Sequence, residues 1–306
     1  MTRSTALSVA VIPFAAASRF ASEAAAAAVG SAAANAAAQT GLQPPAEGPI
    51  PVAFLISEDA VVIDFCGPWE VFRTATVSGR RGPAFRLYTV AETAEPLSVG
   101  GGMRMIPNFT FRTAPSPKVL VIPAQSGESA ATVEWIRQAS RTTDVTMSVC
   151  TGAFLLAKTG LLNGKAATTH HNAYSDLAMQ YPQIQVRRGA RFVEAANLAS
   201  AGGLSSGIDL SLRVVERYFG RAAAAQTADY LEYQGLGWTD PNSNEAYRNR
   251  RVSTAAHPLC PVCDMEVDPG SAPKSVYRGQ TYFFCMPSHK QAFDKAPEAW
   301  LEMLKA

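Results

Sequence analysis

The sequence predicts an α/β domain with a mainly parallel sheet, followed by a small α+β module. Short, continuously apolar runs recur along the chain, and their length suits strands that are buried on both faces. Segments with helical periodicity alternate with these runs, which is typical of parallel α/β folds. From Cys260 onward the chain changes character, with a C-x-x-C spacing, a further cysteine and several aromatic residues.

The composition sets limits on the class of protein. A chain of 306 residues with 47% hydrophobic and 17% charged residues is neither disordered nor a charged coiled coil. The net charge of +2 provides no basic surface for nucleic acid, so no nucleic-acid partner is expected. Five cysteines are too few for a disulfide scaffold of this length. No apolar run approaches the ~20 residues of a membrane helix, so no span is expected in the mature chain.

Residues 1–50 are predicted to be an alanine-rich leader and a linker. Seventeen of the first forty residues are alanine, and Arg3 precedes an apolar stretch over residues 6–17. Its length suits a signal peptide, and residues 15–17 supply small side chains for cleavage. Two localisations stay open: export to the periplasm if this is a signal peptide, and the cytoplasm otherwise. Residues 40–51 are rich in proline and glycine and are expected to form the linker.

The α/β domain is predicted over residues 51–235. Strands are expected at residues 52–56, 85–90, 118–122 and 145–149, with weaker ones at 166–168, 191–194 and 197–200. Helices are expected at residues 65–76, 130–140, 151–159 and 207–219. Residues 236–257 are polar and irregular and are predicted to be a linker to a module at 258–304. That module is short enough to need a metal or disulfide staple.

The first candidate site is a strand-to-helix elbow at Cys150. The predicted strand runs directly into a helix, with Thr151 and Gly152 after the cysteine, which is the pattern of a nucleophile elbow. Such a turn presents the side chain at the C-terminal edge of the sheet, where α/β folds bind ligands. The helix N-terminus is expected to stabilise a thiolate and lower the pKa of Cys150. The alternative is a buried structural cysteine.

Two other polar features fall at the same predicted edge. Asp64 ends an apolar segment before a glycine-proline turn, so it is either a helix cap or a carboxyl group beside Cys150. His170 and His171 end a short strand. Because neighbouring strand side chains alternate sides, at most one of them is expected to face the cysteine.

Three motifs in order carry a family resemblance: DxxGPxEVF from Asp64, SVCTGAFLLA around Cys150, and SAGGLSSGIDLSLRVVE from Ser200. Together they resemble the ThiJ/PfpI superfamily, which has a class I glutamine-amidotransferase-like fold. The branches they are most similar to are the isonitrile hydratases and the amidase-like domains of AraC-type regulators. The resemblance implies that Cys150 is the nucleophile, that Thr151 and Asp64 assist it, and that His170 corresponds to the family's motif histidine. It implies no cofactor for this domain.

Gly67 and Gly127 are expected to line the substrate pocket with His170. The sequence also departs from the hydratases. His171 stands where they have tryptophan, and the loop that usually reads proline-glycine-glycine is Pro123-Ala124-Gln125. Losing two glycines is expected to narrow or reshape an anion pocket built from backbone amides. The helix-turn-helix region of AraC-type regulators is not found, so direct DNA binding is not expected.

The second candidate site is in the C-terminal module. Cys260, Cys263, Cys285 and His289 form a four-ligand set that suits tetrahedral zinc, and copper(I) is an alternative for soft thiolates. A redox pair or disulfide is the other interpretation of the C-x-x-C spacing. The segments CPVCDMEVDP, YRGQTYFFC and SHKQAFDKAPEAWL resemble a YHS domain, and such domains occur beside metal-handling proteins. In that resemblance Cys260 is the least secure ligand.

Two hypotheses for function follow. In the first, the protein is an enzyme whose Cys150 adds to a small electrophilic carbon such as an isonitrile, a nitrile or a reactive carbonyl. Asp64 then handles the proton and Thr151 orients water, while Cys66 is only a packing residue. In the second, the protein is a non-catalytic sensor or metal-handling protein whose cysteine is oxidised or binds a ligand. The resemblance also implies a homodimer.

Overall fold

The computed structural model describes residues 41–248 and 253–305, with side chains described as far as residue 301. The predicted leader and its signal peptide at residues 1–40 lie outside the described residues. The α/β domain and the C-terminal module are each described by themselves. No helix in the described part of the chain is both long and apolar enough to cross a membrane.

The α/β domain is built on a seven-stranded sheet with the order β10-β11-β7-β6-β1-β2-β5. All neighbouring strands are parallel except β10, which is antiparallel to β11. The strands are β1 Ile50–Leu55, β2 Phe85–Ala91, β5 Phe109–Thr110, β6 Val119–Ile122, β7 Val145–Val149, β10 Phe192–Ala195 and β11 Leu198–Ala201. Two short pairs lie outside this sheet: β3 Leu97–Val99 with β4 Met103–Met105, and β8 Ala166–Ala167 with β9 Gln185–Val186. The predicted parallel α/β fold is confirmed.

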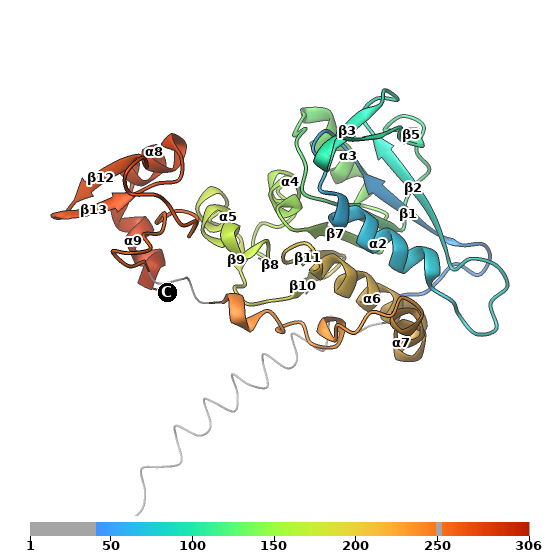
Figure 1. The fold of residues 1–306 in the computed structure, drawn as a ribbon. Coiled ribbons are helices and arrows are strands. Elements are labelled where there is room, and N and C mark those ends of the chain that lie inside the picture. Colours follow the sequence, from blue (N-terminus) through green and yellow to red (C-terminus); the bar gives the residue numbers. More distant parts are fainter. Residues whose placement is uncertain (1–40, 249–252, 306) are drawn as a thin grey trace, which may run out of the picture. The chain divides into compact units, whose positions relative to one another are not determined.

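Helices cover both faces of the sheet (Figure 1). One layer holds α2 Val62–Thr74, α6 Ser206–Phe219 and α7 Arg221–Tyr230; the other holds α3 Ala130–Ala139, α4 Gly152–Lys158 and α5 Tyr174–Gln180. Short 3-10 helices are η2 Gly100–Gly102, η3 His171–Ala173, η4 Gly237–Thr239 and η5 Glu245–Tyr247. In β1, Val52 and Phe54 pack toward the first layer, whereas Ala53 and Leu55 pack toward the second. The strand is apolar throughout because both of its faces are buried.

Helix α2 begins earlier than the sequence predicted. It starts at Val62, so Asp64 lies in its first turn and Gly67 and Pro68 lie inside the helix rather than in a turn before it. Pro68 has no N–H for the Asp64 carbonyl four residues earlier, which removes one helical hydrogen bond. Helix α7 was not predicted, because its sequence RAAAAQTADY has helical propensity but little apolar periodicity.

Part of the segment expected to be a linker packs against the α/β domain. Trp238 in η4 is buried in the domain core, and the Arg221 guanidinium lies 5.0 Å from the centre of its ring. The Arg191 N–H donates to the Pro241 carbonyl at 2.7 Å, just before β10. The buried ring of Trp238 attaches this segment to the domain, although the rest of the segment is too polar to be recognised as part of the core. The domain therefore continues beyond the predicted end at residue 235.

The C-terminal module is a small α+β unit, as predicted. Strands β12 Lys274–Tyr277 and β13 Gln280–Phe283 form an antiparallel hairpin, followed by α8 Pro287–Lys295 and α9 Pro297–Lys305. The two-residue hairpin turn has positive φ at both positions, 49° at Arg278 and 78° at Gly279, which matches the twist of the strands. Phe284, Phe293 and Trp300 are the largest buried side chains of its core.

Candidate functional site

Cys150 occupies the corner between β7 and α4, at the carboxyl edge of the sheet. Its φ of 56° lies in the left-handed region, which is rare for a residue with a side chain. Its N–H donates to the Gly202 carbonyl at 2.9 Å, and its own carbonyl accepts from the Thr169 hydroxyl at 2.9 Å. The predicted strand-to-helix elbow at this cysteine is confirmed, and its backbone is strained.

Gly152 lets the helix after the elbow approach the neighbouring strand. A Cβ atom at this position would collide with the carbonyl oxygens of Ile122 and Pro123, at the end of β6. Because both opposing atoms belong to the backbone, no movement of a neighbouring side chain could relieve that contact. The glycine therefore brings the start of α4 next to the loop that begins at Pro123.

Asp64 is fully buried beneath that loop. Its Oδ2 atom accepts the Ala124 N–H at 3.0 Å, whereas its Oδ1 atom has no partner among the described residues. Burial raises the pKa of this carboxyl to about 7, although the Ala124 hydrogen bond acts in the opposite direction. A carboxyl group with such a pKa can both accept and release a proton near neutral pH.

The pKa of Cys150 is raised to about 11, first by burial and then by the negative charge of Asp64. Hydrogen bonds from the Leu204 and Thr151 backbones and from the Thr151 side chain lower it by less. The predicted lowering of this pKa was therefore wrong, because burial and a neighbouring carboxylate outweigh the amides at the helix start. Because Asp64 and Thr151 both influence the pKa of Cys150, the three residues lie in one site. The role of Asp64 in handling the proton of Cys150 stays a prediction.

His170 lies against the turn that contacts the cysteine. A Cβ atom at Gly203 would lie 2.7 Å from its Cδ2 atom, and its Nδ1 atom accepts the Asn172 N–H at 3.3 Å. Burial and the neighbouring His171 lower the pKa of His170, so the ring is neutral at pH 7. The two histidine rings lie 4.3 Å apart, and His171 stacks on Tyr247 at 4.8 Å. His170 therefore contacts the Gly203 turn beside the elbow, whereas His171 stacks on Tyr247.

The two glycines predicted to line the pocket lie elsewhere around the elbow. Gly67 lines an apolar cleft of about 530 Å³ between α2, α6 and α7, together with Cys66 and Ile208. Gly127 has a φ of 96° and lies against the Ser57 side chain. Their roles toward a substrate stay predictions.

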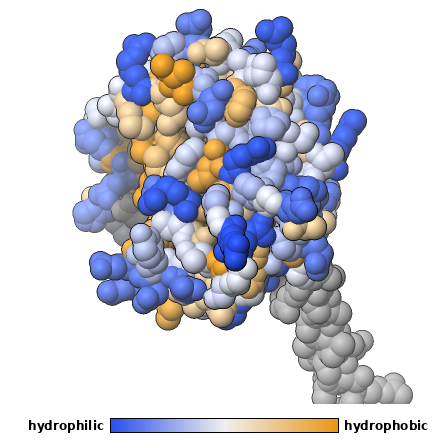
Figure 2. All heavy atoms as spheres, turned by 90° about the vertical axis from the view of Figure 1, so that its right-hand side faces the viewer, coloured by the Kyte–Doolittle hydropathy of each residue, from blue (hydrophilic) through white to orange (hydrophobic). Residues whose placement is uncertain are grey.

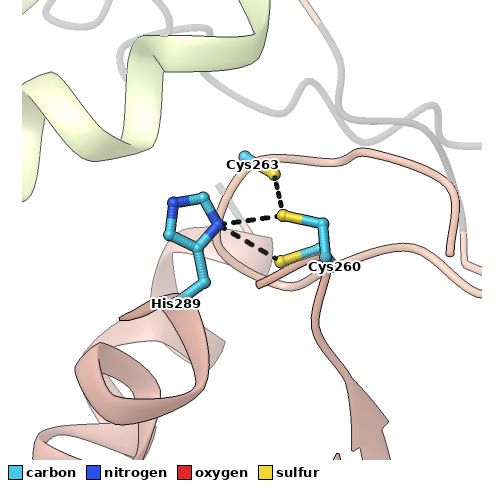
Figure 3. Close-up of side chains that lie close together, drawn as sticks. Cys260, Cys263 and His289 are labelled. Carbon is cyan, nitrogen blue, oxygen red and sulfur yellow. Dashed lines mark hydrogen bonds between the residues drawn. The ribbon is translucent and has the colours of Figure 1, made fainter. Parts of the chain in front are cut away.

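The four predicted metal ligands converge in the C-terminal module, and Figure 3 shows Cys260, Cys263 and His289 side by side. The donor atoms of Cys260, Cys263, Cys285 and His289 all lie within 4.8 Å of one another. His289 Nδ1 is 3.2 Å from the Cys285 sulfur and 3.7 Å from the Cys260 sulfur, and the Cys263 and Cys285 sulfurs are 3.5 Å apart. Ligand atoms around a tetrahedral zinc ion lie roughly 3.5–3.8 Å apart, so these side chains fit such an ion. The three cysteines are free thiols rather than a disulfide.

A tight turn positions the first two cysteines. The Cys260 N–H donates to the Met265 carbonyl, and the Asp264 N–H donates back to the Cys260 carbonyl, both at 2.9 Å. Asp264 completes this turn with a φ of 60°. Cys285 follows β13, and His289 lies in the first turns of α8. A hydrogen bond from Cys263 lowers the pKa of Cys260 to about 4, while the same contact raises the pKa of Cys263.

Sequence reasoning missed a buried ion pair beside the elbow. The Arg191 Nε atom donates to Asp209 Oδ2 at 2.7 Å, and the Arg191 side chain also donates to the Ser205 hydroxyl at 3.1 Å. One signal was available: Asp209 is a carboxylate on the apolar, core-facing side of α6, where an unpaired charge would be costly.

The domain is an α/β protein in which a mainly parallel sheet lies between two helical layers. A strained cysteine lies at a strand-to-helix elbow on the carboxyl edge of that sheet. Residues 51–217 match the DJ-1/PfpI family, and residues 260–303 match the YHS domain. The chain belongs to the DJ-1/PfpI family and carries a YHS domain after it.

Curated and structural relatives agree with this assignment. The chain is 30% identical to the isonitrile hydratase of Pseudomonas putida over 222 residues, which cover 71% of this chain and 93% of that protein. It is 27% identical to the HTH-type transcriptional regulator CdhR of Pseudomonas aeruginosa, over 52% of this chain and 45% of the regulator. A ThiJ/PfpI family protein from Pseudomonas syringae superposes with a TM-score of 0.55 at 25% identity, over 62% of this chain and 78% of that one. Drosophila melanogaster DJ-1beta shares the fold at 16% identity, with a TM-score of 0.53 over 61% of this chain and all of that one.

Proposed function

We propose that the α/β domain is a cysteine-dependent hydratase of small molecules with an electrophilic carbon, isonitriles first among them. The observation that carries this proposal is Asp64. Its carboxyl group is buried, has one oxygen without a partner among the described residues, and interacts electrostatically with the Cys150 thiol. The unpartnered oxygen leaves a position at which the carboxylate can accept a proton, as a general base must. The likeness to the isonitrile hydratase supports the substrate class.

The pKa values define how the two groups would work together. Because the pKa of Cys150 is about 11, the resting group is a thiol and needs a base. Asp64, with a pKa of about 7, takes the thiol proton as the sulfur adds to the terminal isonitrile carbon and the C–S bond forms. The proton then passes from Asp64 to that carbon, giving a thioimidate.

Water completes the reaction. It adds to the carbon of the thioimidate, the C–S bond breaks, the thiol regains its proton, and an N-substituted formamide leaves. The Thr151 hydroxyl and the Leu204 and Thr151 amides hydrogen-bond the sulfur, so they stabilise the negative charge that develops on it. The neutral His170 ring would place no positive charge beside the substrate.

The test is product formation by the purified full-length protein. Wild type is incubated with a small alkyl isonitrile and, in parallel, with the matching nitrile, and the formamide or amide is measured by mass spectrometry. Cys150→Ala should abolish turnover, and Asp64→Asn should reduce it by about two orders of magnitude or more. Cys66→Ala is the matched control, because that thiol lies in the α2–α6 cleft, and it should retain most activity. Equal losses in both cysteine variants would contradict the choice of nucleophile.

A second candidate function has its own support. The same domain is similar to the HTH-type transcriptional regulators CdhR and GbdR of Pseudomonas aeruginosa, so it would bind a small ligand without turning it over. In that case the wild type would bind an isonitrile, seen as a thermal shift, and yield no product. Binding without product by the wild type separates a sensor from an enzyme.

We propose that the YHS domain holds one zinc or copper(I) ion through Cys260, Cys263, Cys285 and His289. All four positions of a tetrahedral ion are taken by protein, so the ion would staple the fold rather than bind substrate. Element analysis of the wild type should find about one ion per chain. Cys263→Ser should lose it, and Cys150→Ser, which removes a thiol outside this domain, should keep it. A metal-free wild type with a disulfide in this domain would overturn the proposal.

Two further expectations belong to the proposal. A homodimer is expected from the resemblance, and the apolar cleft between α2, α6 and α7 offers area that a second copy would cover. Figure 2 shows hydrophobic surface gathered toward one side of the face it displays, among hydrophilic side chains. A monomer in light scattering at every concentration would contradict the dimer.

Export is tested by the intact mass of the chain purified from its host, since cleavage after residue 17 would remove the leader.

A further inference from the structure

The turn at residues 202–205 shapes the surroundings of the elbow sulfur. The Gly202 carbonyl accepts the Cys150 N–H, and the Leu204 backbone hydrogen-bonds the Cys150 sulfur. Leu204 has a φ of 33°, which is unusual for a residue with a side chain, and that side chain is 42% exposed. Packing of the leucine therefore does not explain why its backbone stays in this conformation.

Arg191 holds this turn at both ends. Its carbonyl accepts the Gly202 N–H at 2.9 Å, and its guanidinium donates to the Ser205 hydroxyl at 3.1 Å. The guanidinium is itself fixed by Asp209, with two nitrogens at 2.7 Å and 2.5 Å from the Oδ2 atom. The Asp209 side chain is 1% exposed and that of Arg191 15% exposed, so solvent screens this pair little.

The segment after α7 closes over the ion pair. The Tyr233 hydroxyl donates to Asp209 Oδ2 at 2.9 Å, and the Asn244 Oδ1 atom accepts from Arg191 at 3.2 Å. Gly237 lies so close to both charged side chains that a Cβ atom there would be 2.8 Å from the Asp209 carboxyl carbon. These contacts restrict the guanidinium to one orientation. Replacing a buried ion pair by apolar side chains is often neutral for stability, so a role in fixing geometry accounts better for this one.

We propose that Arg191 is a positioning residue, oriented by Asp209, which holds the 202–205 turn so that the Leu204 backbone faces the Cys150 sulfur. The inference rests on the proposed function only in treating Cys150 as the reacting group. Arg191 does not touch the sulfur and acts through the turn. When the turn relaxes, the Leu204 hydrogen bond to sulfur is lost, and the anionic form of the sulfur loses one of its stabilising contacts.

The test measures the reactivity of Cys150 itself, without a substrate. Full-length protein is alkylated with iodoacetamide at a series of pH values, and the Cys150 peptide is quantified by mass spectrometry, which separates it from the other four cysteines. Below its pKa the alkylation rate follows the thiolate fraction. Arg191→Ala should shift the titration upward by about one pH unit, which is about tenfold slower alkylation at a given pH. The other titratable groups at the elbow, Asp64 on α2 and His170 after β8, are unchanged.

Two variants separate positioning from general stability. Ser205→Ala removes only the contact of the Arg191 side chain with the turn and keeps the buried ion pair, so it should fold and slow alkylation in the same direction by about threefold. Arg213→Ala is the matched control. Its side chain is 18% exposed and pairs with Glu194 and Glu216 on β10 and α6, away from the turn. It should lower stability without moving the Cys150 titration.

The outcomes decide between the interpretations. An upward shift in Arg191→Ala and Ser205→Ala, with none in Arg213→Ala, supports the inference. An unchanged titration in folded Ser205→Ala overturns it, even if Arg191→Ala fails to fold, and so does an equal shift in Arg213→Ala. Because alkylation needs no substrate, absence of isonitrile turnover would refute the proposed function and leave this result standing. Loss of turnover in Ser205→Ala with an unchanged titration would refute this inference and leave the proposed function standing.

Discussion

Replacing Asp64 by asparagine should remove most of the pH dependence of stability of the α/β domain in the acidic-to-neutral range. The pKa of the buried carboxyl is about 7 in the folded protein against an ordinary value of 3.8, so the folded state holds its proton more tightly than the unfolded state. The stability that this carboxyl contributes is therefore fully present below pH 3.8, and it is lost as the pH rises to about 7. A difference of about three units corresponds to a loss of about 4 kcal/mol.

Asparagine is the informative replacement. Its amide oxygen still accepts the Ala124 N–H, while the group cannot ionise. Its amide nitrogen takes the place of the unpartnered Oδ1 atom and adds a cost of about 1–3 kcal/mol that does not change with pH. The quantity to compare is therefore the slope of stability against pH, not the stability at one pH.

The assay is urea unfolding of the full-length protein, followed by far-ultraviolet circular dichroism at several pH values between about 4 and 8. The Asp64 carboxyl should reduce the stability of the wild type by about 4 kcal/mol across this range, and the curve of Asp64→Asn should lack this contribution. Asp229→Asn, which changes an exposed carboxylate on α7, is the control and should keep the wild-type slope. Parallel curves for wild type and Asp64→Asn would refute the raised pKa, and with it the assignment of Asp64 as a base that works near neutral pH.

Three further changes have defined outcomes in urea unfolding. Gly152→Ala forces a Cβ against the backbone at the end of β6, so it should cost about 3 kcal/mol or more; a loss below about 1 kcal/mol would contradict the close approach. Thr169→Val removes the hydrogen bond to the Cys150 carbonyl and should cost about 1 kcal/mol, with no change expected in metal content. Trp238→Ala should destabilise the domain by about 3–5 kcal/mol, because the ring is part of its core; a neutral effect would restore the linker interpretation of this segment.

Features that depend on residues close together in the chain could be predicted from the sequence. The strand β7 was predicted with its observed bounds, because a continuously apolar run followed by a helix leaves few alternatives. The elbow at Cys150 followed from the same local pattern. The C-x-x-C spacing, with a cysteine and a histidine four residues apart later in the chain, was enough to name the four residues that converge. Helix α7 was not found, because alanines carry little contrast between its faces.

Local spacing and apolar pattern were enough to predict the α/β fold class, the elbow and the four residues that cluster in the C-terminal module. The charge states at the elbow and the contacts that support it depend on the tertiary structure. The pKa of Cys150 rises rather than falls because burial and Asp64, distant in sequence, outweigh the local amides. The contacts of Arg191, which lies just before β10, reach the turn before α6 and the segment after α7, and these segments meet only when the sheet has formed. Desolvation depends on everything packed around a group, and no local pattern of residues contains that information.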